Sequence, residues 1–284
     1  MPGSGRGAAQ FRMTEPDSPT APSRAKQADA GPAPSAVPAL SAVPALSVVV
    51  PVHNEAGNIE PLIAEIDAAL AGRIDFEIVY IDDGSGDGSA AELAGLRTGN
   101  ARLRVLRHRQ QSGQSAALWT GVARARAAWI ATLDGDGQND PADIPALLDA
   151  RDRRATPQLW MVAGVRRKRR DGTLKRLSSR IANGVRRRVL RDATTDTGCG
   201  LKLFRRDAYL ALPFFDHMHR FLPALIRRAG GVVIEVPVNH RPRAEGASHY
   251  GMWDRAWVGL VDMLGVAWLQ RRMKTPVVEE MDEL

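Results

Sequence analysis

The sequence lacks three features that would assign it to a common protein class: paired cysteines, a long apolar run and a Walker loop. Cys199 is the only cysteine among 284 residues, so no disulfide can form within the chain and no metal site can rest on cysteine. A reducing, cytosolic setting fits this composition best. No apolar stretch reaches the roughly 18 to 20 residues that a membrane-spanning helix needs, and the pattern G-x-x-x-x-G-K-[ST] does not occur.

The first 45 residues differ in composition from the rest. They are rich in Ala, Pro, Ser and Gly and contain SAVPAL twice, at 35–40 and 41–46. This predicts a disordered tail, and the apolar core of a signal peptide is missing. With 44% apolar and 25% charged residues, the chain can bury the core of one α/β domain. We expect a tail at 1–45, one domain at 46–250, and a membrane-interface helix with its own tail at 251–284.

Positive charge is concentrated in one segment. Between Arg166 and Arg191 there are twelve Lys or Arg residues and one acidic residue, Asp171, which gives a local balance of +11 in a chain of net charge +7. Such a run binds nucleic acid, an anionic membrane surface or a phosphorylated substrate, or forms a solvated helix face.

The last apolar segment has the period of a helix. Its apolar residues recur at spacings of three and four, and three basic residues follow at 271, 272 and 274. A tryptophan-containing stripe that ends in positive charge is typical of a helix lying in the membrane interface. Packing on its own domain or on a second copy explains the stripe equally well. The stripe consists of Trp253, Ala256, Trp257, Leu260, Val261, Leu264 and Trp268.

Strands and helices are predicted to alternate from residue 46 onward. The runs 46–52, 76–81, 103–106 and 128–133 are apolar or β-branched, as expected for strands covered on both faces. Helices are predicted at 58–70, 89–97 and 113–127. Alternation of this kind gives a mostly parallel sheet that binds ligands at the carboxyl ends of its strands. The acidic, glycine-rich turns at 82–89 and 134–140 are therefore predicted to lie at that edge.

The turn at 134–140 carries oxygen ligands. Asp134, Asp136 and the amide of Gln138 follow a strand directly, where Mg²⁺ or Mn²⁺ could bridge a diphosphate. A simple Asp/Gly turn is the alternative. An EF-hand calcium loop is excluded, because its sixth position would be Asn139 instead of Gly and its twelfth Pro145 instead of Glu.

The glycines of the other turn do not form a dinucleotide-binding fingerprint. Gly84, Gly86 and Gly88 are followed by Ser89 where the third glycine of that fingerprint should be. Two aspartates precede them and would repel a pyrophosphate.

Four motifs occur in a characteristic order. They are Pro51-Val52-His53-Asn54-Glu55, Asp82-Asp83-Gly84-Ser85-x-Asp87-Gly88-Ser89, Gly113-x-x-x-Ala117-x-x-x-Gly121 and Asp134-x-Asp136-x-Gln138. In this order and at these separations they resemble family-2 inverting glycosyltransferases, and within them the dolichol-phosphate mannose synthase and polyprenyl-phosphate glycosyltransferase group. The resemblance runs from about Leu46 to Gln270.

The resemblance implies a GT-A fold, which is Rossmann-like with a mostly parallel sheet and flanking helices, and it implies roles for the matching residues. The nucleotide would be bound by Pro51, Glu55, Asp82, Asp83 and Asp134. The cation, Mg²⁺ or Mn²⁺, would be held by Asp134, Asp136 and Gln138. Catalysis would depend on Asp134, Asp136, Arg166 and Lys202. The acceptor phosphate would be bound by Arg180, Lys202, Arg241 and Arg243.

A phosphate acceptor suits the basic residues. Its second pKa is near 6, so at neutral pH it is already a nucleophile and needs positive charge more than a general base. We expect a metal-dependent, inverting transferase that moves one sugar from GDP-mannose or a UDP-sugar to a polyprenyl phosphate. We expect it to be cytoplasmic and peripheral, on the inner face of a bacterial-type membrane.

Two other functions remain open at this point. One is transfer to a sugar hydroxyl of a lipid or glycan. The other is a basic module that binds membrane or nucleic acid, which would leave the aspartates of the two turns unexplained. No nucleic acid partner is expected, and the sequence does not decide the oligomeric state. Because the Q-x-x-R-W signature of processive synthases is missing, we expect transfer of a single sugar.

Overall fold

We describe the protein from a computed structural model. It describes residues 43–167, 184, 188–190, 194–242 and 252–272, with side chains of the last segment from 259 onward. Residues 1–42 of the predicted tail lie outside this part of the chain. So do two predicted acceptor residues, Arg180 and Arg243, and most of the basic run.

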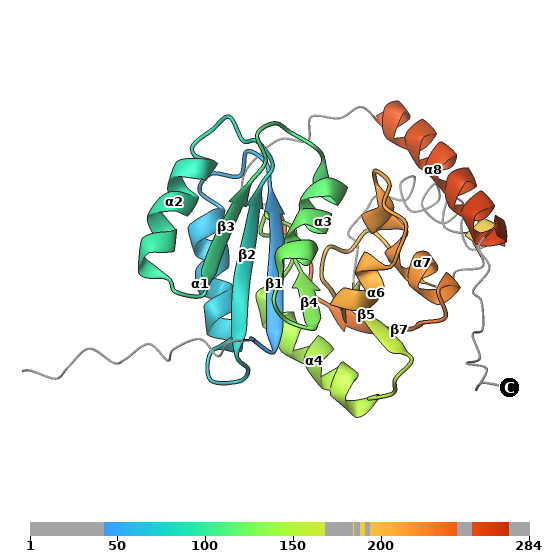
Figure 1. Cartoon of the computed structure of the whole chain (residues 1–284), viewed down its shortest axis with the longest axis horizontal. Helices are drawn as coiled ribbons and strands as arrows, with labels where there is room; N and C mark the ends of the chain where they lie inside the picture. The colour runs from blue at the N-terminus through green and yellow to red at the C-terminus, as the bar shows by residue number, and fades with distance from the viewer. Residues whose placement is uncertain (1–42, 168–183, 185–187, 191–193, 243–251, 273–284) are drawn as a thin grey trace, which may run out of the picture. The chain divides into compact units, whose positions relative to one another are not determined.

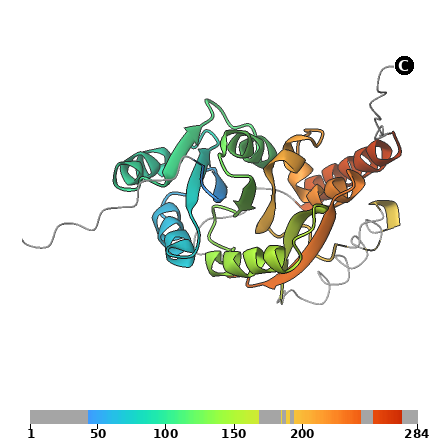
Figure 2. The same cartoon turned by 60° about the horizontal axis from the view of Figure 1, so that its bottom comes forward.

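The described residues form one seven-stranded sheet with helices on both faces, as Figures 1 and 2 show. The strand order is β3-β2-β1-β4-β6-β5-β7. Strand β6 is antiparallel to both of its neighbours, β4 and β5, whereas every other pairing is parallel. The predicted mostly parallel sheet is confirmed. The strands are β1 (Leu46–Val52), β2 (Phe76–Asp82), β3 (Leu103–Arg107), β4 (Trp129–Thr132), β5 (Leu159–Arg166), β6 (Lys202–Arg205) and β7 (Val232–Val238).

The first three helices lie where the sequence predicts them, with ends that differ by a few residues. The helices are α1 (Ile59–Leu70), α2 (Ser89–Gly99), α3 (Gln114–Arg124), α4 (Ile144–Arg153), α6 (Arg206–Leu210), α7 (Leu222–Arg228) and α8 (Met252–Arg272), with short 3-10 turns η1 (Pro141–Asp143) and η2 (Met218–Arg220).

The apolar strands are covered on both sides. In β1 all seven residues are buried, and neighbouring residues point to opposite faces. Val48 and Val50 belong to the core that includes α1, α2 and α4, whereas Val49 belongs to the core that includes α3, α6, α7 and α8. Burial on both faces explains why the strand shows no polar alternation.

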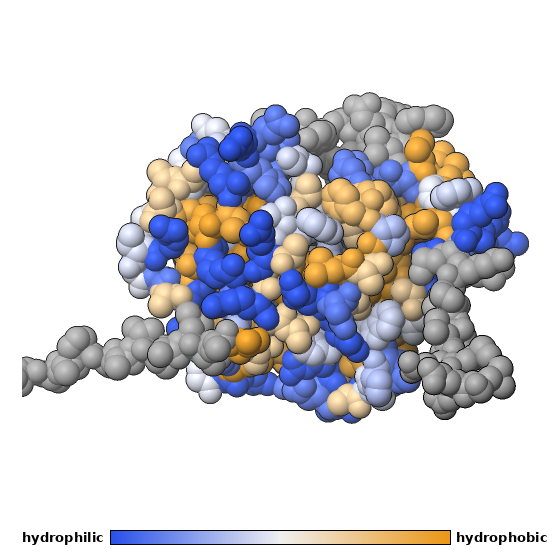
Figure 3. All heavy atoms as spheres, in the orientation of Figure 1, coloured by the Kyte–Doolittle hydropathy of each residue, from blue (hydrophilic) through white to orange (hydrophobic). Residues whose placement is uncertain are grey.

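Helix α8 packs on the domain with a face other than the predicted stripe. Met263 and Val266 are buried in the core next to α7. The stripe residues Leu264 and Trp268 are 57% and 61% exposed, and Leu260 and Val261 are also exposed. Apolar surface is visible along α8 in Figure 3. Within the described residues, no helix has the length and apolar content to span a bilayer.

Candidate active site

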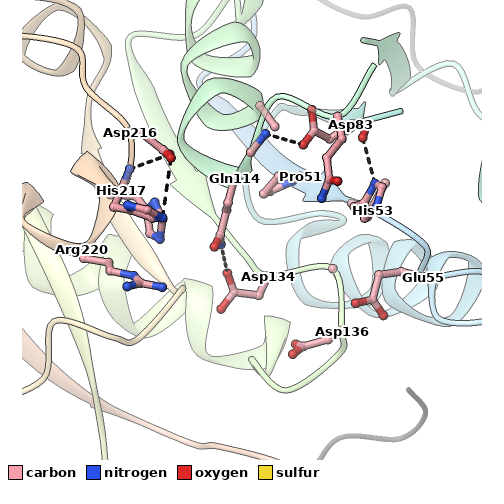
Figure 4. A pocket seen from close by; sticks show the side chains of 16 residues that line it. Pro51, His53, Glu55, Asp83, Gln114, Asp134, Asp136, Asp216, His217 and Arg220 are labelled. Carbon is pink, nitrogen blue, oxygen red and sulfur yellow. Dashed lines mark hydrogen bonds and ion pairs between the residues drawn. The ribbon is translucent and has the colours of Figure 1, made fainter. Parts of the chain in front are cut away.

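A cavity of about 640 Å³ lies at the carboxyl ends of β1, β2 and β4. Its walls come from the turns after these strands, from the start of α3 and from residues 216–220 (Figure 4). The carboxyl ends of parallel strands meet at one edge, so turns far apart in sequence come together there. Among the residues predicted to form the site, the structure brings Pro51, Glu55, Asp83, Asp134 and Asp136 into this one cavity.

Asp82 does not line the cavity. It is fully buried, its Oδ1 accepts a hydrogen bond from the Ser85 amide at 2.9 Å, and its Oδ2 lies 3.0 Å from Arg107 Nε. These contacts shape the turn after β2, so the predicted nucleotide contact is not supported. Adjacent residues of an extended chain point in opposite directions, and the sequence alone does not tell which of two neighbouring aspartates faces the ligand.

Asp83 is the aspartate that faces the cavity, and three donors hold it in place. Its Oδ1 accepts from the Ser112 amide at 2.9 Å and lies 2.7 Å from His108 Nδ1, while its Oδ2 accepts from the Gly113 amide at 2.8 Å. Gly113 has φ +91°, a conformation that favours glycine. A carboxylate oxygen accepts hydrogen bonds, so Asp83 can receive an N–H group of a nucleobase.

Asp134 and Asp136 lie on the loop after β4. Gln114 Nε2 donates to Asp134 Oδ1 at 2.8 Å, and the Gln138 amide donates to Asp136 Oδ1 at 3.1 Å. Asp134 is also tightly enclosed, because a Cβ added at Gly200 would lie 2.1 Å from its Oδ2. Both carboxylates line the cavity (Figure 4).

Gln138 does not complete a ligand set with them. Its side chain is not part of the cavity wall, and its Nε2 lies 3.5 Å from the backbone oxygen of Arg241. The predicted role of Gln138 as a cation ligand is therefore not supported by its position.

The two aspartates suit a divalent cation that is also bound by a ligand. Burial raises the pKa of Asp134, Lys202 opposes this shift, and the negative charge of Asp136 adds to it. A cation between the two carboxylates would offset both burial and repulsion. In proteins Mg²⁺ often takes only one or two carboxylates and completes its shell with substrate phosphates and water. Within the described residues no group of three or more His, Cys, Asp or Glu side chains could hold a metal ion.

A second cavity of about 360 Å³ adjoins the first and has the opposite charge. Arg166 and Lys202 line it, together with Thr197, Gly198, Gly200 and the first turn of α7. Asp134 therefore lies where the first, acidic cavity meets the second, basic cavity. The residues that line both cavities are Gln114, Asp134, His219 and Arg220.

The two predicted cations of the basic cavity are held differently. Lys202 is only 6% exposed, so burial lowers its pKa and the nearby Asp134 opposes that shift. Its Nζ contacts the backbone oxygen of Cys199. Arg166 makes a bidentate pair with Asp196, with Nε–Oδ2 at 2.6 Å and Nη2–Oδ1 at 2.7 Å. The cavity wall thus contains one buried ammonium group and one guanidinium of fixed orientation.

Arg241 lines neither cavity. Its guanidinium makes hydrogen bonds with both carboxylate oxygens of Glu65, at 2.9 and 2.8 Å, and with Asp140 Oδ1. The predicted contact with the acceptor phosphate is not supported, because two carboxylates already engage this side chain. Glu65 is 176 residues away in sequence, so spacing could not reveal the pairing.

Several cavity residues were missed by the sequence prediction. Gln114 follows the Gly113 turn directly, and this position at the start of a helix beside an acidic strand end was its only signal. Asp216, His217 and His219 come from a segment dense in titratable residues. His217 has φ +61°, and its Nδ1 lies 3.1 Å from Asp262 Oδ2 of α8, so α8 contacts the wall of the acidic cavity.

His219 should control how stability depends on acid. Burial lowers its pKa to about 3, and the positive charges of Lys202, Arg220 and His217 add to the effect. In the unfolded chain histidine binds its proton near pH 6.5. The folded state therefore binds fewer protons between pH 6.5 and 3, and stability falls as pH drops through that window.

We expect His219→Asn to reduce the slope of the free energy of unfolding against pH between pH 6.5 and 3. One proton corresponds to about 1.4 kcal/mol per pH unit in the free energy of unfolding. Asparagine can keep the contact between His219 Nδ1 and Ser115 Oγ, which measures 2.7 Å. Urea unfolding at several pH values below 6.5 measures the slope, and an equal slope in both proteins would contradict the assignment.

Comparison with known proteins points to one family. The sequence profile of Glycosyl transferase family 2 matches residues 47–212. Dodecaprenyl-phosphate galacturonate synthase of Rhizobium johnstonii is 36% identical over 238 residues, which cover 81% of this chain and 68% of that protein. Undecaprenyl-phosphate 4-deoxy-4-formamido-L-arabinose transferases of Edwardsiella ictaluri and Pseudomonas aeruginosa are 35% and 36% identical over 72% of this chain. The chain spans 62% and 59% of the length of those two transferases.

Solved structures share the fold. Glucosyl-3-phosphoglycerate synthase of Mycobacterium tuberculosis, solved with Mn²⁺, UDP and phosphoglyceric acid, has a TM-score of 0.59 and covers 82% of this chain, with 80% of its own length matched. At 18% identity this likeness concerns the fold alone. The predicted GT-A fold is confirmed. Together, the profile match and the relatives show that the chain belongs to glycosyltransferase family 2.

Proposed function

We propose that the protein transfers one sugar from a nucleotide-sugar donor to a polyprenyl phosphate with inversion. The observation that carries this proposal is the meeting of an acidic and a basic cavity at Asp134. The names of the relatives contain dodecaprenyl phosphate or undecaprenyl phosphate, which supports a polyprenyl phosphate as the acceptor. The donor is GDP-mannose or a UDP-sugar, and the same names favour a galacturonate or arabinose derivative.

The acidic cavity would bind the donor. Asp83, Pro51 and Glu55 would contact the nucleoside, and Asp134 and Asp136 would hold Mg²⁺ or Mn²⁺. When bound, such an ion stabilises the negative charge of the departing nucleoside diphosphate. The fixed hydrogen bonds of Asp83 mean that its orientation does not have to change on binding.

The basic cavity would bind the acceptor phosphate. Lys202 and Arg166 would neutralise it and direct one oxygen to the anomeric carbon, on the side opposite the leaving diphosphate. One C–O bond forms as another breaks, which inverts the configuration. His219, which lies at the junction, is neutral at pH 7 because its pKa is near 3. A phosphate that is already ionised does not need it as a base.

Radiolabelled nucleotide sugars test the acceptor. The protein is incubated with each labelled donor, Mn²⁺ and undecaprenyl phosphate, and lipids are then extracted. Label should enter a lipid that mild acid hydrolyses, as a glycosyl phosphodiester does. Label found only in an acid-stable glycoside would overturn the phosphate acceptor and favour transfer to a hydroxyl group. Calorimetry with different nucleoside diphosphates and Mn²⁺ would identify the nucleotide.

The exposed face of α8 suits the membrane that holds such an acceptor. Leu260, Val261, Leu264 and Trp268 are exposed, and Arg271 and Arg272 at the end of the helix are exposed as well. Apolar side chains beside basic ones match an anionic bilayer surface. The buried face, with Met263 and Val266, would keep the helix on the domain while the other face enters the interface.

Replacing Leu264 and Trp268 with serine should release the protein from anionic liposomes. Losing two large apolar side chains should weaken partitioning by about tenfold or more, whereas the melting temperature should stay the same because neither side chain is buried. The matched control is Val232→Ser, which changes an apolar residue of β7 that is 44% exposed. If the double variant sediments with liposomes as well as the wild type does, α8 is not the membrane contact.

A further inference from the structure

We infer that Arg241 is a positioning residue that clamps the loop carrying Asp134 and Asp136. This inference rests on the proposed function, because it assigns the loop to binding of the cation and the diphosphate. Arg241 acts on the far end of the loop, at Gln138 and Asp140, and touches neither cavity.

The guanidinium joins the loop to α1. Its Nη1 donates to both oxygens of Glu65, at 2.9 and 2.8 Å, and its Nη2 donates to Asp140 Oδ1. Burial lowers the pKa of Arg241, but the hydrogen bonds to Glu65 and Asp140 raise it by more, so the group stays charged. A planar fork with fixed donors can bind two carboxylates at once, which a lysine cannot do with the same geometry.

The backbone around Arg241 is also hydrogen-bonded to the loop. The Arg241 amide donates to Gln138 O at 2.9 Å, and Asn139 and His240 form an antiparallel bridge. One step earlier, the Asn239 amide donates to Asp143 Oδ2 at 2.6 Å. The segment that follows β7 is therefore attached to this part of the chain by main-chain and side-chain contacts at four positions, 138, 139, 140 and 143.

The loop needs an outside anchor because its own backbone is permissive. Gly135 and Gly137 flank Asp136, and Gly137 has φ +71°. Glycine loses more conformational freedom on ordering than any other residue. At the near end β4 fixes the loop, and at the far end the side chain of Asn139, which is 2% exposed, accepts from the Asp134 amide at 3.0 Å. Holding residues 138–140 therefore sets where the two carboxylates point.

Four variants test the clamp: Arg241→Gln, Glu65→Gln, the double variant and Arg241→Lys. Calorimetry measures the affinity for a nucleoside diphosphate with Mn²⁺. Each single Gln variant should weaken this affinity by roughly three- to tenfold, as expected for a partly exposed, hydrogen-bonded charge pair. The double variant should be no worse than the Arg241 variant alone, because Arg241→Gln already removes the contact that Glu65→Gln removes. Arg241→Lys keeps the positive charge but not the planar guanidinium. Its affinity for the nucleoside diphosphate should lie between that of Arg241→Gln and that of the wild type.

Two further readouts separate positioning from other roles. Hydrogen–deuterium exchange of the metal-free protein should rise at residues 134–140 in the Gln variants, and the KM for polyprenyl phosphate should change less than twofold. Arg73→Gln is the matched control, because it removes an Arg–Asp pair with Asp149, in which both side chains are nearly half exposed, away from the cavities. It should leave affinity and exchange unchanged.

Distinct results would overturn the clamp. If Arg241→Gln raises the KM for polyprenyl phosphate and Glu65→Gln does not, Arg241 contacts the acceptor instead. If wild-type protein binds the nucleotide and neither variant changes affinity or exchange, the clamp does not exist. If wild-type protein binds no nucleoside diphosphate with Mn²⁺, the proposed function fails, and exchange in the metal-free protein still decides whether Arg241 fixes the loop.

Discussion

Asp136→Asn should lower turnover by roughly two to three orders of magnitude, the size of effect expected when a main electrostatic stabiliser of a transition state is lost. Asn keeps the shape of the side chain but removes the charge that would hold the divalent cation opposite Asp134. Initial rates with saturating donor and Mn²⁺ measure the effect.

The fold should survive this change. The hydrogen bond that Asp136 Oδ1 accepts from the Gln138 amide, at 3.1 Å, can be kept by the asparagine oxygen. Asp152→Asn is the control, because that carboxylate is 61% exposed and pairs only with its neighbour Arg151 in the described structure. Near-normal turnover of Asp136→Asn, or full activity of the wild type in excess EDTA, would refute the assignment of the cation to this loop.

Lys202→Met should also cost about a hundredfold or more in kcat/KM for polyprenyl phosphate. Methionine has a similar length and suits a site that is 6% exposed, so the fold should tolerate it. The lost charge is the buried ammonium of the basic cavity, where the acceptor phosphate would lie. Affinity for the nucleoside diphosphate should change much less, because that ligand would occupy the other cavity.

The comparison with Arg205 sharpens the test. Arg205 lies on the same strand, β6, but pairs with Asp207 on the surface. Arg205→Gln removes the same charge at a distance from the cavities and should leave both kinetic constants close to those of the wild type. If Lys202→Met weakens donor binding as strongly as it affects the acceptor, Lys202 serves the diphosphate instead.

The elements of the fold could be predicted because their signals are local. Buried parallel strands read as continuous apolar runs, as Leu46–Val52 and Phe76–Asp82 do, and the helices between them have the period of a buried stripe. From this alternation it follows that Glu55, Asp83, Asp134 and Asp136 meet at one edge. The order of the four motifs also predicted glycosyltransferase family 2, and the profile match confirms that prediction.

The direction and pairing of side chains were decided only by the tertiary structure. Asp82 and Asp83 are equivalent in the sequence, yet one ties the turn to Arg107 and the other faces the cavity. The periodicity of α8 predicted an apolar face with Leu264 and Trp268, whereas the residues that α8 buries against the domain are Met263 and Val266.

Arginine shows the same limit over a longer distance. The resemblance assigned Arg241 to the acceptor phosphate and Arg166 to catalysis, but Glu65 and Asp140 hold Arg241 away from the cavities, while Asp196 fixes Arg166 in the wall of the basic one. Secondary structure depends on neighbours a few residues away, so the sequence by itself determined the strands, the helices and the edge where the site lies. Which charge meets which depends on contacts between residues up to 176 positions apart, and only the packed chain brings those together.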